Sequence, residues 1–119
     1  MEPRNIPCVE EIESFLYNFR ALKEKFGMVI YDRKKNLKAL LDLEITAIER
    51  EKILDNLTAR DYYKGPQKDG VNIGAEYWEF GTTIKGTETY IKISKGLGNQ
   101  AVACLSFHPA ERRIKYPFK

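Results

Sequence analysis

The C-terminal half of the chain holds five residues able to do acid–base and phosphate chemistry, each at or near the end of a hydrophobic run. They are Lys64, Glu79, Tyr90, Lys92 and His108. If these runs form one small antiparallel sheet, side chains alternate between its faces, and Glu79, Tyr90, Lys92 and His108 can gather on one face. A base, an acid and cations beside an aromatic hydroxyl suit the cleavage of RNA without a metal.

Metal-free RNA cleavage makes three demands on a site. A base takes the proton of the ribose 2′-hydroxyl, an acid protonates the leaving 5′-oxygen, and a positive group stabilises the charged phosphorane. We expect Glu79 or a deprotonated lysine to be the base, and His108, the only histidine, to be the acid. Lys64 and Lys92 would hold the phosphate, and Tyr90 would orient it or stack on a base.

Alternation along two predicted strands sorts these residues by face. Over 87–94 the polar face carries Glu88, Tyr90, Lys92 and Ser94, and the other face carries Thr87, Thr89, Ile91 and Ile93. Over 102–108 one face carries Val102, Cys104, Ser106 and His108, and the other carries Ala103, Leu105 and Phe107. The alternative is an ordinary solvent-exposed face with a structural histidine.

Length and charge bound the class of protein. A chain of 119 residues predicts a single domain over residues 1–119, with residues 1–8 as a flexible lead-in. Hydrophobic residues make up 43% of the chain, which is typical of a globular protein. The net charge of +3 is only mildly basic, but basic residues cluster at 33–38 and at 112–119. We expect Arg112 and Arg113 to contact substrate phosphates; the alternative is a solvated surface.

The sequence gives no sign of a metal, a cofactor or a membrane. Cys8 and Cys104 lie far apart and do not have zinc-ligand spacing, and Cys104 lies in an apolar run that predicts burial. The first residues do not resemble a signal peptide, and no apolar stretch is long enough to span a bilayer. We therefore expect a cytoplasmic protein with no cofactor, no metal and no membrane contact.

The N-terminal half predicts helices. Apolar residues at steps of three and four predict an amphipathic helix over Val9–Phe26, ended by Gly27. Met28–Tyr31 is either a short strand or a buried extended segment. Asn36 is expected to cap a second helix, with Leu37, Leu40, Leu41 and, as a further candidate, Leu43 on its apolar face.

A third helix is expected from Ala47 to about Leu57, after a capping box of Thr46 and Glu49. Its inward residues would include Ile48, Ile53 and Leu54.

The pattern then changes to strands. Lys64–Gly74 is rich in Gly, Pro and charge, and predicts a loop. Ala75–Phe80, Thr87–Ser94 and Gln100–His108 predict strands joined by hairpins, and Ile114–Lys119 could add an edge segment. We expect Trp78 to lie in the core, and one of Tyr62 and Tyr63 to pack inward. The fold class is therefore α+β, with N-terminal helices packed on a small antiparallel sheet.

From about Leu57 to Lys119 the chain resembles the MqsR-type toxins of bacterial toxin–antitoxin systems, which have a RelE-like ribonuclease fold. The segments that carry the resemblance are Leu57–Lys64, Tyr77–Glu79, Gly86–Ile93 and Leu105–His108. In order and spacing they are similar to an aromatic-Lys turn, a Trp followed by a polar residue, a Gly-led Tyr-x-Lys strand and a final Ser-Phe strand. Residues 1–26 look like an addition or a divergent first helix.

The resemblance implies an mRNA interferase that needs no metal, that works with or without the ribosome, and that a cognate antitoxin protein neutralises. It implies that Lys64 is a catalytic or phosphate-binding lysine and that Tyr90 is the active-site tyrosine. Glu79 stands where a Gln is expected, and His108 stands where the pattern ends in a lysine. These two departures predict either a retuned acid–base pair or lost activity.

Three functions therefore remain open: a toxin endoribonuclease, a catalytically silent domain of the same fold that binds a protein or RNA, and an unrelated small α+β interaction domain. Gathering of the candidate residues on one concave basic surface would favour the first. Scattering of these residues, or burial of His108 in the core, would favour the third. Only an activity assay separates the first from the second.

Overall fold

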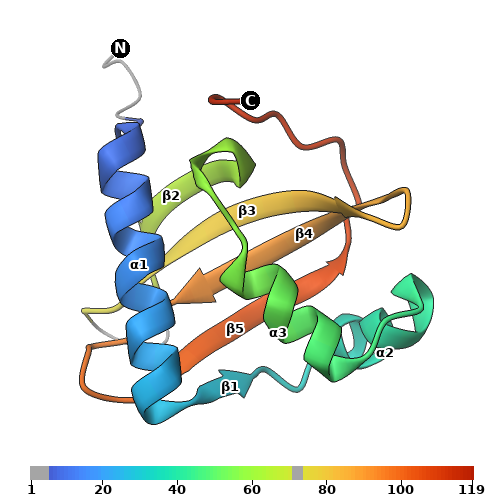
Figure 1. Cartoon of the computed structure of the whole chain (residues 1–119), viewed down its shortest axis with the longest axis horizontal. Helices are drawn as coiled ribbons and strands as arrows, with labels where there is room; N and C mark the ends of the chain where they lie inside the picture. Colours follow the sequence, from blue (N-terminus) through green and yellow to red (C-terminus); the bar gives the residue numbers. More distant parts are fainter. Residues whose placement is uncertain (1–5, 71–73) are drawn as a thin grey trace.

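Five strands form one sheet in the order β1-β5-β4-β3-β2, as the ribbon in Figure 1 shows. The computed structural model describes residues 6–70 and 74–119. All neighbouring strands are antiparallel except β1 and β5, which are parallel. The strands are β1 (Met28–Ile30), β2 (Tyr62–Lys68), β3 (Glu76–Ile84), β4 (Thr87–Ser94) and β5 (Val102–Pro109).

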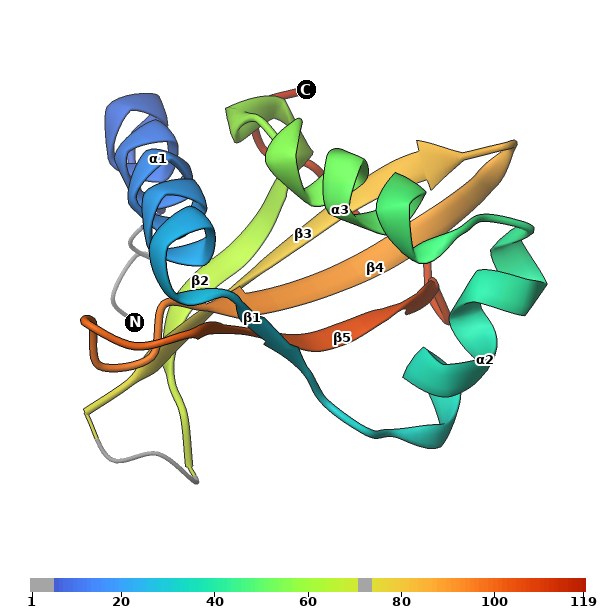
Figure 2. The ribbon, with the colours of Figure 1, turned by 60° about the horizontal axis from the view of Figure 1, so that its bottom comes forward.

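The helices precede the long strands in sequence, which confirms the predicted α+β class. The prediction of an antiparallel sheet is wrong at one edge, because β1 pairs with β5 in parallel and makes the sheet mixed. They are α1 (Val9–Phe26), α2 (Lys34–Leu43), α3 (Ala47–Asp55) and the short 3-10 helix η1 (Ala59–Asp61). Figure 2 shows α1 and α3 on one face of the sheet, with α2 near the β1–β5 side. No helix among the described residues is long and apolar enough to cross a membrane.

The core lies between α1 and the helix-covered face of the sheet. The apolar stripe of α1 is buried at Ile12, Phe15, Leu16 and Phe19. The ring of Trp78 stacks on Phe15 with the ring centroids 4.4 Å apart, which confirms that the only tryptophan belongs to the core. Burial of each large apolar side chain stabilises the fold by roughly 1.5–3 kcal/mol.

Other predictions about buried side chains are also confirmed. Cys104 is fully buried, and burial raises the pKa of its thiol to about 12, so it packs as a small hydrophobe. Tyr62, not Tyr63, is the tyrosine that packs inward. On β4 the predicted split holds, because Thr89, Ile91 and Ile93 are fully buried on one face.

Local helix signals are confirmed at two helices. Helix α1 has the predicted bounds, and Gly27 follows it with a φ of 85°, which suits glycine. The Thr46 hydroxyl accepts a hydrogen bond from the Glu49 amide, and the Glu49 carboxylate accepts one from the Thr46 amide, as the predicted capping box requires. Helix α3 ends at Asp55, two residues before the predicted end.

The predicted cap and two of the predicted apolar residues of α2 are wrong, and so is one inward residue of α3. Helix α2 begins at Lys34 with Arg33 as its N-cap, so Asn36 lies inside the helix. Leu37 and Leu41 are 67% and 79% exposed, and Ile48 is 69% exposed. Leu43 is buried and Leu40 packs against the core, as predicted, and Ala39 is buried beside them, because α2 packs beside β5 and buries only that narrow side.

Two predictions for the C-terminal half are also wrong. Lys64–Gly74 is not a loop throughout, because β2 extends from Tyr62 to Lys68 and pairs with β3; residues 71–73 lie outside the described residues. The 114–119 segment is not a strand, although Ile114 is buried. The predicted lead-in over residues 1–8 falls mostly outside the described residues.

Candidate functional site

A β-bulge on β2 turns Lys64 toward the face of the sheet opposite α1 and α3. Tyr62 pairs with Phe80 and Lys64 pairs with Glu79, so Tyr63 is an extra residue on its strand. Without the extra residue, Lys64 would share the buried face of Tyr62, because side chains alternate along a regular strand. The bulge thus makes Lys64 the cross-strand partner of Glu79 on the open face, where the Lys64 amine lies 4.9 Å from the centroid of the Tyr63 ring.

A second bulge, on β5, does the same for His108. Lys92 pairs with Ser106 but Ile93 pairs with Cys104, which leaves Leu105 as an extra residue. The prediction that Val102, Cys104, Ser106 and His108 share one face is therefore wrong. Val102 and Cys104 lie in the apolar core, whereas Ser106 and His108 pair with residues of the open face.

The side chain of Asn36 holds the β5 bulge in place. Its amide nitrogen donates hydrogen bonds to the carbonyl oxygens of Leu105 at 2.9 Å and Tyr31 at 3.1 Å. Its oxygen accepts a hydrogen bond from the Phe107 amide at 3.1 Å. Asn36 is 3% exposed. Because β1 ends at Ile30, the Asn36 side chain takes the place of a neighbouring strand and supplies hydrogen-bond partners for the backbone of β5 at Leu105 and Phe107.

The open face carries a pocket of about 310 Å³ at the C-terminal end of β5. All four residues predicted to be catalytic line it, and so do both arginines predicted to bind substrate: Lys64, Glu79, Tyr90, His108, Arg112 and Arg113. Lys92 does not line it; its amine lies 4.3 Å from the centroid of the Tyr77 ring, farther along the same face. The structure thus gathers six of the seven predicted site residues.

Within the pocket, the Tyr90 hydroxyl donates a hydrogen bond to Oε1 of Glu79, with the oxygens 2.5 Å apart. Burial, followed by this hydrogen bond, raises the pKa of Tyr90 far above its ordinary value. Tyr90 therefore keeps its proton and acts as a donor that fixes the orientation of the Glu79 carboxylate. It is not a base.

His108 pairs with Tyr90 across the strands, and their ring centroids lie 5.5 Å apart. Its Nδ1 lies 2.9 Å from the carbonyl oxygen of Pro109, a contact that requires a hydrogen on Nδ1. In the neutral ring, Nε2 then carries the lone pair, and after protonation it carries an acidic hydrogen. His108 is buried, with 9% of its surface exposed, but it lines the pocket and pairs with Tyr90 on the open face of the sheet.

Glu88 holds the C-terminal segment that carries Arg112 and Arg113 against the sheet. Its two carboxylate oxygens accept hydrogen bonds from the Ile114 amide at 3.0 Å and from the Tyr116 hydroxyl at 3.1 Å. Its backbone carbonyl accepts one from the Ala110 amide at 2.8 Å. Residues 110–119, which we call the C-terminal strap, therefore run from the end of β5 back toward β2, as Figure 1 shows.

The strap crosses the sheet at Gly81. A Cβ atom there would lie only 2.5 Å from Cδ1 of Ile114 and 2.6 Å from the Tyr116 hydroxyl, so a larger residue would have to push these two side chains of the strap aside. The sequence analysis missed Gly81, Glu88 and Asn36. A lone glycine inside a strand signals a close approach of another chain segment and could have identified Gly81. The roles of Glu88 and Asn36 depend on contacts distant in sequence.

The pocket lining includes an imidazole, the two carboxylates of Glu79 and Glu111, the two phenols of Tyr63 and Tyr90, and three cations. The cations suit an anionic ligand, and the Glu79 carboxylate and the imidazole suit the transfer of a proton to and from that ligand. In the described part of the chain, no group of three or more His, Cys, Asp or Glu side chains is placed to hold a metal ion.

Comparison with known proteins identifies no relative of this chain. No protein-family model, no curated protein and no solved structure matches it. The resemblance to MqsR-type toxins, carried by the short segments between Leu57 and His108, therefore stays a prediction. So do the chemical roles of the residues in the pocket.

Proposed function

We propose that this chain is an endoribonuclease that cleaves RNA by acid–base chemistry at the pocket of Lys64, Glu79, Tyr90 and His108. The observation that carries the proposal is the convergence of these four side chains, from four different strands, with two arginines on one pocket. This set supplies a base, an acid and countercharge from the protein itself. We further propose that the α+β fold is of the RelE-like ribonuclease type.

In the proposed reaction, the ribose 2′-oxygen attacks the adjacent phosphorus as Glu79 takes the 2′-hydroxyl proton. The bond from the 2′-oxygen to phosphorus forms and the bond from phosphorus to the 5′-oxygen breaks. The 5′-oxygen takes a proton from Nε2 of protonated His108, which leaves a 2′,3′-cyclic phosphate and a 5′-hydroxyl. Tyr90 keeps Glu79 oriented, because its hydroxyl already donates to that carboxylate.

The cations of the pocket would stabilise the phosphorane. Lys64 stands beside Glu79 across the bulged strand pair, and Arg112 and Arg113 form the wall that the C-terminal strap contributes. Charges already in place as the phosphorane forms lower its energy without reorganisation of solvent. Lys92, outside the pocket lining, is a candidate for contact with a more distant part of the RNA.

The biological setting that we propose is a cytoplasmic toxin of a toxin–antitoxin pair. Its partners would be an RNA substrate, with or without the ribosome, and a cognate antitoxin protein. The gathering of the candidate residues on one pocket supports an enzyme over an unrelated interaction domain. A catalytically silent domain that binds RNA or a protein would have the same pocket, so the decisive measurement is one of activity.

The test is cleavage of single-stranded RNA by the purified chain in excess EDTA, beside the variant His108→Ala. We expect cyclic-phosphate ends in EDTA and a loss of rate of about 10²–10⁴-fold in the variant. Circular dichroism would check that the variant is folded. Equal rates for the two proteins would remove His108 from the mechanism, and loss of activity in EDTA would overturn the metal-free reaction.

The same pair of proteins gives a test in cells. Induction of the unpartnered chain in a bacterial host should stop growth and degrade mRNA, and His108→Ala should relieve both effects. Normal growth and intact mRNA, with the folded protein present, would favour the silent binding domain.

A further inference from the structure

A second cavity, of about 420 Å³, adjoins the candidate pocket on the side away from His108. It lies between the start of β2 and the C-terminal strap. Its lining is Tyr63, Lys64, Arg113, Lys115, Tyr116 and Pro117. Tyr63, Lys64 and Arg113 also line the first pocket, so the two spaces share a wall and form neighbouring compartments of one surface.

The lining of this second cavity combines positive charge with aromatic rings. Three of its six described lining residues are cations and none is a carboxylate, whereas the first pocket includes Glu79 and Glu111. Tyr116 is fixed there because its hydroxyl donates to the Glu88 carboxylate. The two spaces therefore differ in chemistry: the first has groups that move protons, and the second has groups that only bind.

Cations also accompany each ring of the second cavity. The Lys64 amine lies 4.9 Å from the centroid of Tyr63, and the Lys119 amine lies 4.6 Å from the centroid of Tyr116. Aromatic rings interleaved with cations are the chemistry that binds single-stranded nucleic acid, in which bases stack and phosphates need countercharge. A mononucleotide unit, with one planar base and one phosphate, has both features.

We propose that the second cavity binds the nucleotide adjacent to the cleaved phosphate in a single-stranded RNA. This inference rests on the proposed function. The base of that nucleotide packs against Tyr63 or Tyr116, and its phosphate is held by Lys115 and Arg113. Lys64 and Arg113, in the shared wall, contact both the cleaved phosphate and the next one. Lys115 contacts only the second phosphate, because it lines the second cavity alone.

Lys115 lines only the second cavity, whereas Lys64 and Arg113 line both. Binding measurements alone can therefore test the proposal. The probes are fluorescent 2′-O-methyl oligoribonucleotides, which cannot react through the 2′-oxygen. A dinucleotide has one internucleotide phosphate and fills only the first pocket; a pentanucleotide extends into the second cavity. Fluorescence anisotropy would give the Kd of each probe over a series of salt concentrations for the wild type, Lys115→Ala and Lys25→Ala.

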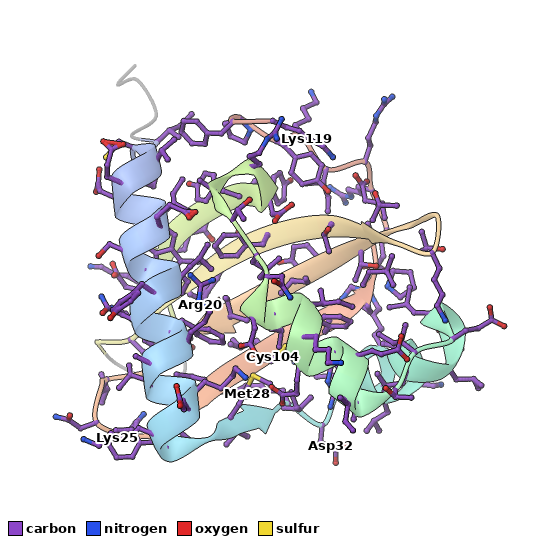
Figure 3. All side chains as sticks on the ribbon, in the orientation of Figure 1. Arg20, Lys25, Met28, Asp32, Cys104 and Lys119 are labelled. Carbon is purple, nitrogen blue, oxygen red and sulfur yellow. The ribbon has the colours of Figure 1, made fainter. Side chains whose placement is uncertain are left out.

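Lys25→Ala is the matched control, because it also removes one exposed lysine amine, but at the C-terminal end of α1 and not at the second cavity. Figure 3 shows Lys25 and Lys119 at opposite ends of the molecule, and Lys119 lies against the Tyr116 ring of the second cavity. Lys25 and Lys115 are both exposed, so neither substitution is expected to unfold the protein.

For the pentanucleotide, we expect Lys115→Ala to raise the Kd by about threefold to tenfold and to lower the slope of log Kd against log salt by about 0.7, the effect of one lost phosphate contact on a single strand. The dinucleotide should bind both variants as it binds the wild type. An abasic site moved along the pentanucleotide should weaken wild-type binding most at one position beside the scissile linkage, where stacking is lost.

The subsite would be overturned if Lys115→Ala left the slope of log Kd against log salt unchanged for the pentanucleotide. It would also be overturned if Lys25→Ala weakened pentanucleotide binding as much as Lys115→Ala does. Failure of the subsite and failure of the proposed function are distinguishable. If Lys115→Ala gives the expected binding results but the wild type cleaves no RNA, the subsite is supported and the proposed enzymatic activity is rejected. If the wild type cleaves RNA and the Lys115 slope is unchanged, the enzyme stands and the subsite does not.

Discussion

The Tyr90 hydroxyl lies 2.5 Å from Oε1 of Glu79 and donates a hydrogen bond to it, although the two residues are not direct cross-strand partners. Tyr90 pairs with Gly81, and Glu79 lies two residues away on the same face of β3. The phenol therefore reaches diagonally along β3, from the level of Gly81 to that of Glu79. This contact links the residue that we propose as the base to a donor that stays protonated at physiological pH.

The raised pKa of Tyr90 predicts how stability depends on alkaline pH. Burial and then the hydrogen bond to Glu79 raise that pKa above the ordinary value of about 10. As pH rises past 10, the unfolded chain loses this proton while the folded chain keeps it, so the free energy of unfolding must fall. The contribution is complete below pH 10 and is lost as pH approaches the folded-state pKa.

Tyr90→Phe should therefore make the decline in stability above pH 10 less steep, and Tyr17→Phe, at an exposed ring on α1, should not. Urea unfolding between pH 8 and pH 11 measures the effect. Part of the slope should persist, because burial and the hydrogen bond to Glu88 raise the pKa of Tyr116 as well. Parallel curves for the wild type and Tyr90→Phe would contradict the shift.

Glu79→Gln separates the chemistry of Glu79 from its structural contact. The carbonyl oxygen of the substituted amide still accepts the Tyr90 hydrogen bond, so we expect the free energy of unfolding to change by no more than about 1 kcal/mol. The amide is not a base, so RNA cleavage should slow by about 10²–10⁴-fold. Glu76→Gln, at an exposed position on the same strand, is the control. A variant that cleaves at the wild-type rate would transfer the role of base to another residue.

Asn36 should be essential to the fold although it lies outside the pocket. Asn36→Ala leaves the Leu105 carbonyl and the Phe107 amide without their partner in a buried place, and we expect a loss of about 2–4 kcal/mol in stability. Asn36→Asp keeps the acceptor for Phe107 but loses the donor to Leu105, and replaces a neutral group with a buried charge; it should not rescue the loss. Chemical denaturation gives both values, and a loss below about 1 kcal/mol for Asn36→Ala would disprove the role.

Gly81→Ala should release the C-terminal strap. The added methyl would collide with Ile114 and Tyr116, and overpacking of this kind costs about 1–3 kcal/mol. Trypsin should then cut after Arg112 or Arg113 faster than in the wild type, and RNA binding should weaken. Gly70→Ala, at a site where a Cβ would meet nothing within 4 Å, is the control. A strap as resistant to trypsin as the wild type would show that the collision is absorbed elsewhere.

Features that depend on nearby residues could be predicted from the sequence. The bounds of α1 follow from an apolar stripe and Gly27, and the start of α3 follows from the Thr46–Glu49 capping box. Four of the pocket residues, Lys64, Glu79, Tyr90 and His108, were also predictable, because each is a reactive side chain at or near the end of an apolar run. These signals need no knowledge of the partner strands.

Features that depend on distant residues could not be predicted. Gly65 and Pro66 signal a loop locally, yet they lie within β2, because Lys64 and Gln67 on either side of them pair with β3. Asn36 is a residue type that often caps helices, but here its side chain bonds to Leu105 and Phe107 of β5, which lie far away in the sequence. The side of the sheet that His108 occupies depends on the Leu105 bulge, which simple alternation does not predict.

The bulges at Tyr63 and Leu105 have a consequence for any transfer of this site to another sheet. Copying Lys64, Glu79, Tyr90 and His108 by identity and order onto regular strands would send some of these side chains into the core of the host. Deleting one residue at each bulge would do the same in this chain. A transferred site must therefore include Tyr63 and Leu105 together with the reactive residues. The extra residue in each strand decides whether a reactive side chain faces solvent or the core.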